Sequence, residues 1–155
     1  MKKNRHRKHG FVLLVLYLVL LTYFLFFAEV MGRNPNARED YSYNLTLFKE
    51  IRRFLVHRDI LGYQAVIVNV FGNMAAFMPF GFILPEVWDQ LNHWYTIVFL
   101  GFLFSLGIEI IQLVSRVGSF DVDDILLNTI GALTGYGLFV IAKGVWNRYY
   151  GTNRK

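Results

Sequence analysis

Long apolar runs, separated by short polar segments, dominate the pattern of side chains along this sequence. The runs lie at about residues 11–30, 65–84, 94–114 and 124–142. An α-helix rises 1.5 Å per residue, so roughly 20 apolar residues cross a hydrocarbon core about 30 Å thick. The pattern therefore predicts an all-α integral membrane bundle of four transmembrane helices, forming a single domain over residues 1–155.

The long connection at residues 32–62 carries a different pattern. Its apolar residues recur at helical spacing, with charged residues between them: Leu45, Phe48, Ile51 and Leu55, against Lys49, Glu50, Arg52 and Arg53. This spacing predicts a short amphipathic helix in the first extracytoplasmic loop. The helix would lie either in the membrane interface or against the bundle, as an ordinary loop helix does.

Two prolines punctuate the second apolar run. Pro79 has no N–H to donate to the carbonyl of Ala75, so we expect the helix to kink or loosen there. Pro85 stands at the end of the run, where we expect the helix to end.

Composition agrees with a membrane protein, because 55% of the 155 residues are hydrophobic and 17% are aromatic. The absence of cysteine excludes disulfides and thiolate metal sites. A net charge of +5 raises the question of nucleic acid, but the aromatic residues lie inside the apolar runs, away from the basic ones. We therefore predict no nucleic-acid partner and take the lipid bilayer as the surroundings of the chain.

The positions of the basic residues indicate the orientation. Nine Lys or Arg residues lie in the two tails and none in the 86–93 turn, against seven in the two opposite loops. Because cytoplasmic segments carry the excess of positive charge, this distribution predicts a multi-pass protein with both termini in the cytoplasm.

Polar residues recur at helical spacing on three of the predicted spans. The shared faces hold Asn69 and Asn73; Ser105, Glu109, Gln112 and Arg116; and Asp121, Asp124, Asn128, Gly131 and Gly135. Lipid cannot satisfy polar groups, so these faces should meet one another. With the termini inside, they lie in the outer half of the membrane, which predicts an outward-facing pocket rather than a pore. The simpler interpretations are interhelical hydrogen bonds and, for the two glycines, close helix packing.

Several of these residues could carry chemistry. Asp121, Asp123 and Asp124 offer oxygen ligands suited to a divalent cation, the one cofactor that the sequence indicates. They also stand at a predicted helix start, where carboxylates cap free amides. Arg116 could hold a phosphate or carboxylate, or could pair with Glu109 or Asp124. No Ser/His/Asp set is visible, so catalytic residues are not assigned.

Four segments, taken in order, resemble the successive signatures of the VanZ-like family. They begin at Asn44-Leu-Thr-Leu-Phe-Lys-Glu-Ile51, continue with Asn69-Val-Phe-Gly-Asn73-Met-Ala-Ala-Phe-Met-Pro79-Phe-Gly81-Phe-Ile-Leu-Pro85 and Glu109-Ile-Ile-Gln112, and end with Phe120-Asp-Val-Asp-Asp124-Ile-Leu-Leu-Asn128-Thr-Ile-Gly131. The resemblance covers about residues 44–135. It implies a bacterial cytoplasmic membrane protein linked to low-level resistance to the glycopeptide teicoplanin, and it implies no catalytic mechanism.

Three hypotheses follow from the pocket and the resemblance together. The first is a non-enzymatic protein that lowers surface binding of lipoglycopeptides by engaging a lipid or cell-wall precursor headgroup. The second is a metal-assisted enzyme acting on a lipid-linked phosphate substrate. The third is an assembly partner of another membrane protein, with the polar faces as its contact surface. Oligomeric state is not predicted.

Overall fold

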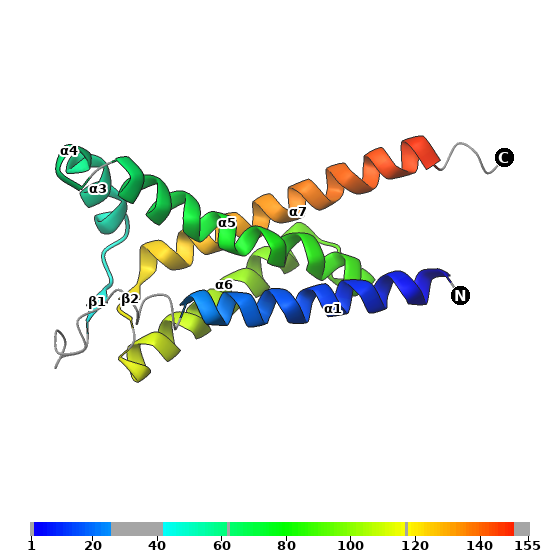
Figure 1. The fold of residues 1–155 in the computed structure, drawn as a ribbon, viewed down its shortest axis with the longest axis horizontal. Helices are drawn as coiled ribbons and strands as arrows, with labels where there is room; N and C mark the ends of the chain where they lie inside the picture. Colours follow the sequence, from blue (N-terminus) through cyan, green and yellow to red (C-terminus); the bar gives the residue numbers. More distant parts are fainter. Residues whose placement is uncertain (1, 26–41, 62, 117, 151–155) are drawn as a thin grey trace.

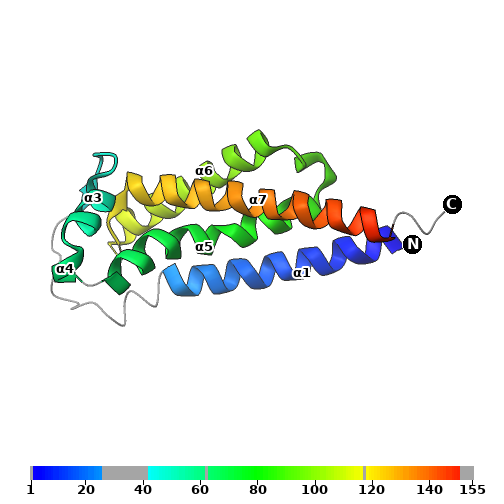
Figure 2. The same cartoon turned by 90° about the horizontal axis from the view of Figure 1, so that it is seen from above.

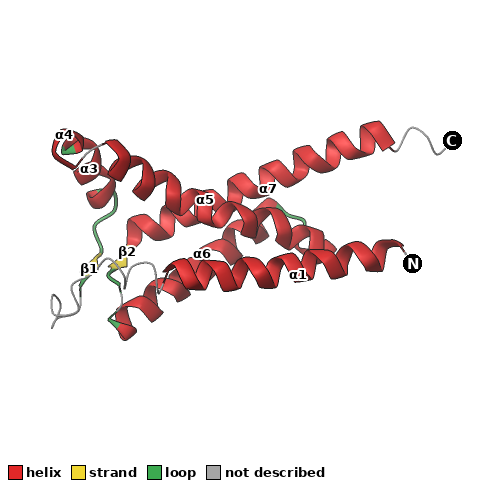
Figure 3. Cartoon of the chain, in the orientation of Figure 1, coloured by secondary structure: helices red, strands yellow, loops and turns green. Residues whose placement is uncertain are grey.

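The computed structural model describes residues 2–25, 42–61, 63–116 and 118–150, and nearly all of them are helical (Figure 3). The elements in chain order are α1 (Lys2–Tyr23), β1 (Tyr43–Asn44), α3 (Lys49–Val56), α4 (Arg58–Leu61), α5 (Tyr63–Val87), η2 (Asp89–Leu91), α6 (Trp94–Ser115), β2 (Phe120–Asp121) and α7 (Val122–Tyr150). The predicted all-α class is confirmed, apart from the two short strands.

The four long helices run alongside one another as an elongated bundle (Figures 1 and 2). The start of α1 and the C-terminal end of α7 lie at one end of the bundle. The short helices α3 and α4 and both strands lie at the opposite end, which we call the α3 end. A helix is therefore present where the sequence predicts the amphipathic one, although it begins only at Lys49.

Three helices in the described part of the chain are long and apolar enough to cross a membrane: Asn69–Val87, Trp94–Ser115 and Val122–Tyr149. The first predicted span falls on α1, which also includes the basic tail from Lys2. Residues 26–30 of that span lie outside the described residues. A membrane protein is thus supported by three helices, and the fourth crossing stays a prediction.

The ends of two helices, α5 and α7, differ from the predicted ones. The predicted stop at Pro85 is wrong, because α5 continues to Val87. A proline removes one N–H, but the next turn still closes through the Trp88 N–H, which donates to the Leu84 carbonyl over 3.0 Å. Helix α7 begins at Val122 and runs to Tyr150, beyond the predicted 124–142 at both ends.

The tightest packing joins α5 to α7 through glycine. A Cβ added at Gly131 or at Gly135 would overlap the backbone carbonyl of Met74 or Met78, respectively. In the other direction, Gly81 of α5 lies against the backbone of Ala132. The prediction that the two glycines of α7 serve close helix packing is confirmed, and this approach fixes the spacing of two helices that carry site residues.

Helix α1 packs on α5, around an aromatic core. Phe80 stacks on Phe104 of α6 with ring centroids 5.1 Å apart, beside the fully buried Phe77. The hydroxyl of Tyr17 donates to the Ala76 carbonyl over 2.9 Å. Ala76 follows Ala75, whose carbonyl loses its helical donor at Pro79, so the Tyr17 bond ties α1 to α5 next to the proline turn.

Candidate functional site at the α3 end

A two-residue parallel ladder brings the loop before α3 to the start of α7. Tyr43 pairs with Phe120 and Asn44 with Asp121. The Phe120 N–H also donates to the Ser42 carbonyl over 3.1 Å. This contact joins segments more than 70 residues apart, so no local sequence pattern predicts it. It sets the polar residues of both segments next to one another.

Asp123 caps α3 from the first turn of α7. Its side chain is 1% exposed, and its carboxylate accepts the N–H groups of Phe48, Glu50 (2.8 Å) and Ile51 (3.2 Å). The side chain at the N-cap position of α3, Phe48, makes no capping bond, and its φ of 64° is left-handed. The first N–H groups of a helix have no partner within the helix, so Asp123 satisfies them and fixes α3 to the bundle.

Asp121 is the cap of α7 itself. One of its carboxylate oxygens accepts the Asp123 N–H over 2.8 Å and the amide of Asn44 over 3.1 Å. Burial raises the pKa of the Asp121 carboxyl, and the hydrogen bonds from Asp123 and Asn44 oppose that rise. The interpretation of these aspartates as helix caps therefore holds for two of them, on two different helices.

Glu109 of α6 holds the backbone of the same ladder. Its side chain is 3% exposed, and its Oε2 accepts the Asp121 N–H over 2.9 Å. The carboxylate thus positions the β2 backbone. This role differs from the ligand-facing role that the helical stripe suggests.

The polar faces of α5, α6 and α7 do meet within the bundle. Asn73 donates its amide to Asp124, and Asn128 donates to the Ser105 hydroxyl over 2.9 Å. Asn128 is 4% exposed, and its Oδ1 is the one buried side-chain oxygen or nitrogen without a hydrogen-bond partner among the described residues. These contacts are interhelical hydrogen bonds, as the simpler interpretation of the polar residues expects.

Two further predicted pocket residues, Gln112 and Arg116, lie at the end of α6. The buried Gln112 donates to the carbonyl of Leu25, two residues after the end of α1, over 3.4 Å. Arg116 is exposed and takes a left-handed conformation (φ 57°) as the C-cap of α6. Left-handed C-cap positions usually hold glycine, so the backbone at Arg116 carries some strain.

A polar cavity of about 350 Å³ opens between α3, the ladder and the ends of α5 and α7. Its polar lining is contributed by Ser42, Asn44, Lys49, Glu50, Arg53, Asn69, Ser119, Asp121 and Asp124. Of the eight predicted pocket residues, three line this cavity, whereas Asn73, Glu109, Gln112, Arg116 and Asn128 do not. Sequence reasoning missed Lys49 and Arg53 as site residues. Their spacing of four, which sets them on one face of a helix, is the signal that could have found them.

The lining carries both signs of charge. Lys49 and Arg53 project from α3, while Asp121 and Asp124 belong to the ladder and α7. Arg53 forms an ion pair with Glu50 at 2.9 Å across one turn of α3. A guanidinium has five N–H donors, so this pair leaves donors for a second anion.

Comparison with known proteins identifies the family. The VanZ/LLP1 family matches residues 14–143. The chain belongs to the VanZ/LLP1 family. Protein VanZ of Enterococcus faecium is 29% identical over 76 residues, which are 49% of this chain and 47% of that protein, so the match spans about half the length of that relative. No solved structure matches the chain.

The four segments that carry the VanZ-like resemblance converge on the cavity and its supports. The first runs from the last residue of β1 into the first turn of α3, and the second lies in α5, with Asn69 at the cavity wall. The third contains Glu109, which holds the backbone of Asp121 at the start of the fourth. The segments thus build one place in the fold, although they are spread over about 90 residues of sequence.

The aspartates do not form a metal centre in this arrangement. No group of three His, Cys, Asp or Glu side chains among the residues described is placed to hold a metal ion. Both oxygens of Asp123 are directed at backbone N–H groups, and one oxygen of Asp121 already accepts two donors. The donor set therefore does not fit the predicted divalent-cation site, and we derive no chemical step through a metal.

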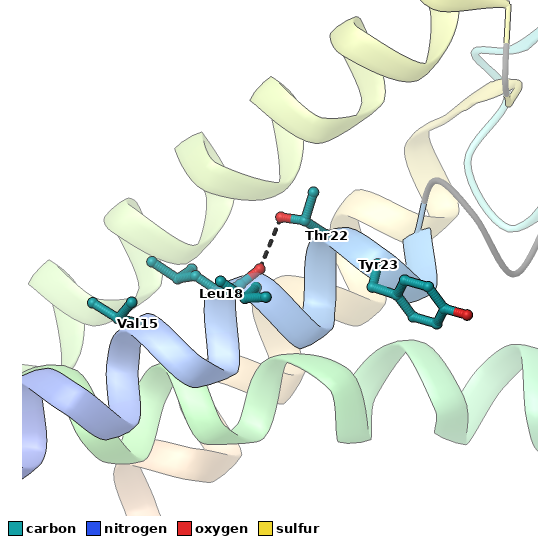
Figure 4. A pocket seen from close by; sticks show the side chains of 5 residues that line it. Val15, Leu18, Thr22 and Tyr23 are labelled. Atoms are coloured by element: carbon teal, nitrogen blue, oxygen red, sulfur yellow. Dashed lines mark hydrogen bonds between the residues drawn. The ribbon is translucent and has the colours of Figure 1, made fainter.

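Two apolar grooves lie along the bundle. One, of about 450 Å³, runs beside the ladder and is lined by Leu45, Leu47, Phe102, Leu106, Phe120, Val122, Ile125, Leu126 and Thr129. The other, of about 480 Å³, is lined among the described residues by α1, including Val15, Leu18, Thr22 and Tyr23 (Figure 4). In that groove the Thr22 hydroxyl donates to the Leu18 carbonyl of its own helix (Figure 4).

Proposed function

We propose that this VanZ/LLP1 family member lowers susceptibility to teicoplanin-type lipoglycopeptides by engaging a lipid or cell-wall precursor headgroup in the polar cavity. The family of the chain and its similarity to Protein VanZ are the reasons for proposing this kind of function. The observation that carries it is the cavity of about 350 Å³, lined by charged groups at one end of a bundle of membrane-crossing helices.

The location of the cavity suits a headgroup. Its lining includes Asn69 in the first part of α5 and Asp121 directly before α7, so it opens at the end of the bundle where these two helices begin. Headgroups occupy this level of a bilayer, just outside the hydrocarbon. With both termini in the cytoplasmic compartment of a bacterium, the α3 end faces the cell exterior, where a lipoglycopeptide arrives.

The cavity is held open by its supports. The cap from Asp123 fixes α3 on one side, and Glu109 fixes the ladder on the other. A preorganised site loses less free energy on binding than one that must order itself. A headgroup sequestered there would be withdrawn from lipoglycopeptide binding without any bond being broken, so the proposed activity needs no catalysis.

Of the alternatives, the metal-assisted enzyme has no support from the donor set at the cavity. An assembly partner would place its contacts on α3 or on the exposed faces of the spans. Co-purification of one stoichiometric protein from cells that produce the tagged chain would favour this alternative.

The test is the susceptibility of a teicoplanin-sensitive bacterium that produces the chain. Wild type should raise the inhibitory concentration of teicoplanin, and Arg53→Gln or Asp124→Asn should reduce that gain at equal membrane abundance. The matched control is Arg58→Gln, which removes an exposed positive charge from α4, outside the cavity lining. Full protection by both cavity variants would refute the proposed function.

A further inference from the structure

The basic groups of the cavity, Lys49 and Arg53, both come from α3, where Glu50 pairs with Arg53, while the ladder and α7 contribute the carboxylates of Asp121 and Asp124. A ligand that carried only a phosphate would gain from Lys49 and Arg53 but would face the carboxylates of Asp121 and Asp124. A ligand that carried only an ammonium would gain from Asp121 and Asp124 but would face Lys49 and Arg53. A ligand with both groups, spaced by a short linker, would satisfy both sets of charges.

The apolar groove shares a wall with this cavity. Asp121 lines the cavity, whereas its neighbours Phe120 and Val122 line the groove, as alternation along an extended segment directs. On the other side of the ladder, both residues of β1, Tyr43 and Asn44, line the cavity, and Leu45 directly after the strand lines the groove. The ladder therefore has a charged side and an apolar side, like the boundary between the headgroups and the tails of a bilayer.

The groove continues along helices that cross the membrane. Phe102 of α6 and Thr129 of α7 lie within candidate spans, and Phe102 is 42% exposed. In a bilayer, lipid chains would therefore cover this part of the groove. The cavity itself lies at the small end of the range for ligand sites, about 300–1,000 Å³. That size suits a small headgroup and not a disaccharide with a peptide.

We infer that the cavity and the groove together bind a bilayer phospholipid whose small headgroup carries a phosphate and an ammonium, with one hydrocarbon chain in the groove. The phosphate accepts from Lys49 and Arg53, and the ammonium donates to Asp124 and Asp121. This inference rests on the proposed function and names the class of headgroup.

The experiment measures binding of three lipids with identical chains to the purified, delipidated full chain, by native mass spectrometry. The lipids are phosphatidylethanolamine, its N-acetylated form, which keeps the phosphate and loses the ammonium, and a diacylglycerol that bears an amine without phosphate. Wild type should bind phosphatidylethanolamine at least tenfold more tightly than either of the others. Equal affinity for phosphatidylethanolamine and its N-acetylated form would overturn the inference.

Variants separate the two sets of charges. Lys49→Gln should weaken both phosphate lipids and leave the amine lipid unchanged, whereas Asp124→Asn should weaken phosphatidylethanolamine and leave its N-acetylated form unchanged. Thr129→Phe, which fills the groove, should weaken all three lipids. Its control is Ile130→Phe, one residue along the same helix and outside the groove lining, which should bind as wild type does. The same loss for all lipids in Lys49→Gln and Asp124→Asn would overturn the assignment of charges.

The two proposals fail in different ways. Loss of protection in the cavity variants, without any preference for the doubly charged headgroup, would overturn the inference and leave the proposed function standing. A strong preference for that headgroup, with undiminished protection in the cavity variants, would support the inference and overturn the proposed function.

Discussion

Asp123→Asn tests how the cavity is built, because Asp123 is the link between α7 and α3. One oxygen of the carboxylate accepts a hydrogen bond from the Phe48 backbone N–H, and the other accepts from the backbone N–H groups of Glu50 and Ile51. An asparagine of the same shape has one acceptor, so at least one of the three N–H groups would face an NH₂ group instead. A bond to a charged acceptor contributes about 1.5–3 kcal/mol, and the bonds that remain lose the charge, so we expect a loss of about 3 kcal/mol.

The loss should appear first in α3. In purified protein, amides 48–56 should exchange with deuterium much faster in Asp123→Asn than in wild type, while α5 to α7 keep their protection. The control is Asp59→Asn, which changes a carboxylate that is 79% exposed on α4 and should exchange as wild type does. Unchanged exchange in residues 48–56 of Asp123→Asn would refute the capping role.

Four further changes test other parts of the structure by thermal unfolding, with the teicoplanin assay added where protection is at issue. Glu109→Gln keeps an acceptor for the Asp121 N–H, so normal abundance and protection are expected; lost protection in a folded protein would show that the charge itself is needed. Arg116→Gly should stabilise the chain by about 1 kcal/mol and keep protection, because glycine fits the left-handed C-cap; lost protection would restore Arg116 to the site. Gly131→Ala should destabilise by about 1–3 kcal/mol through overlap with α5, whereas Gly137→Ala, which meets open space, should not; equal effects would contradict the packing. Because burial raises the pKa of Asp121 above 3.8, the folded chain holds this proton more tightly than the unfolded chain does. The contribution of Asp121 to the free energy of unfolding should therefore fall as pH rises from 3.8 through the raised pKa. If the difference in free energy of unfolding between wild type and Asp121→Asn did not change with pH, this reasoning would be contradicted.

The spans could be predicted because their signal is local. A run such as 94–114 must be helical in lipid, and the structure places α6 at Trp94–Ser115. The glycine packing of Gly131 and Gly135 likewise follows from spacing alone. The stop at Pro85 was wrong because one missing N–H does not end a helix whose following turn is intact.

The candidate site could be predicted only in part. Helical spacing finds which residues share a face, and Asn73 with Asp124 shows that such faces meet. It does not reveal that Asp123 caps a helix far away in sequence, because that contact depends on the ladder between Asn44 and Asp121. The basic wall of the cavity was missed for the same reason, since Lys49 reaches the site only through this long-range fold.

Binding of fluorescent teicoplanin to the surface of living cells tests most directly whether the cavity protects by engaging a headgroup. Cells that produce wild type should bind less teicoplanin than cells without the chain, and Asp124→Asn should restore binding at equal membrane abundance. A labelled glycopeptide without a lipid chain should bind equally in all three strains. Equal teicoplanin binding with and without the wild-type chain, in cells that it nevertheless protects, would contradict this mechanism.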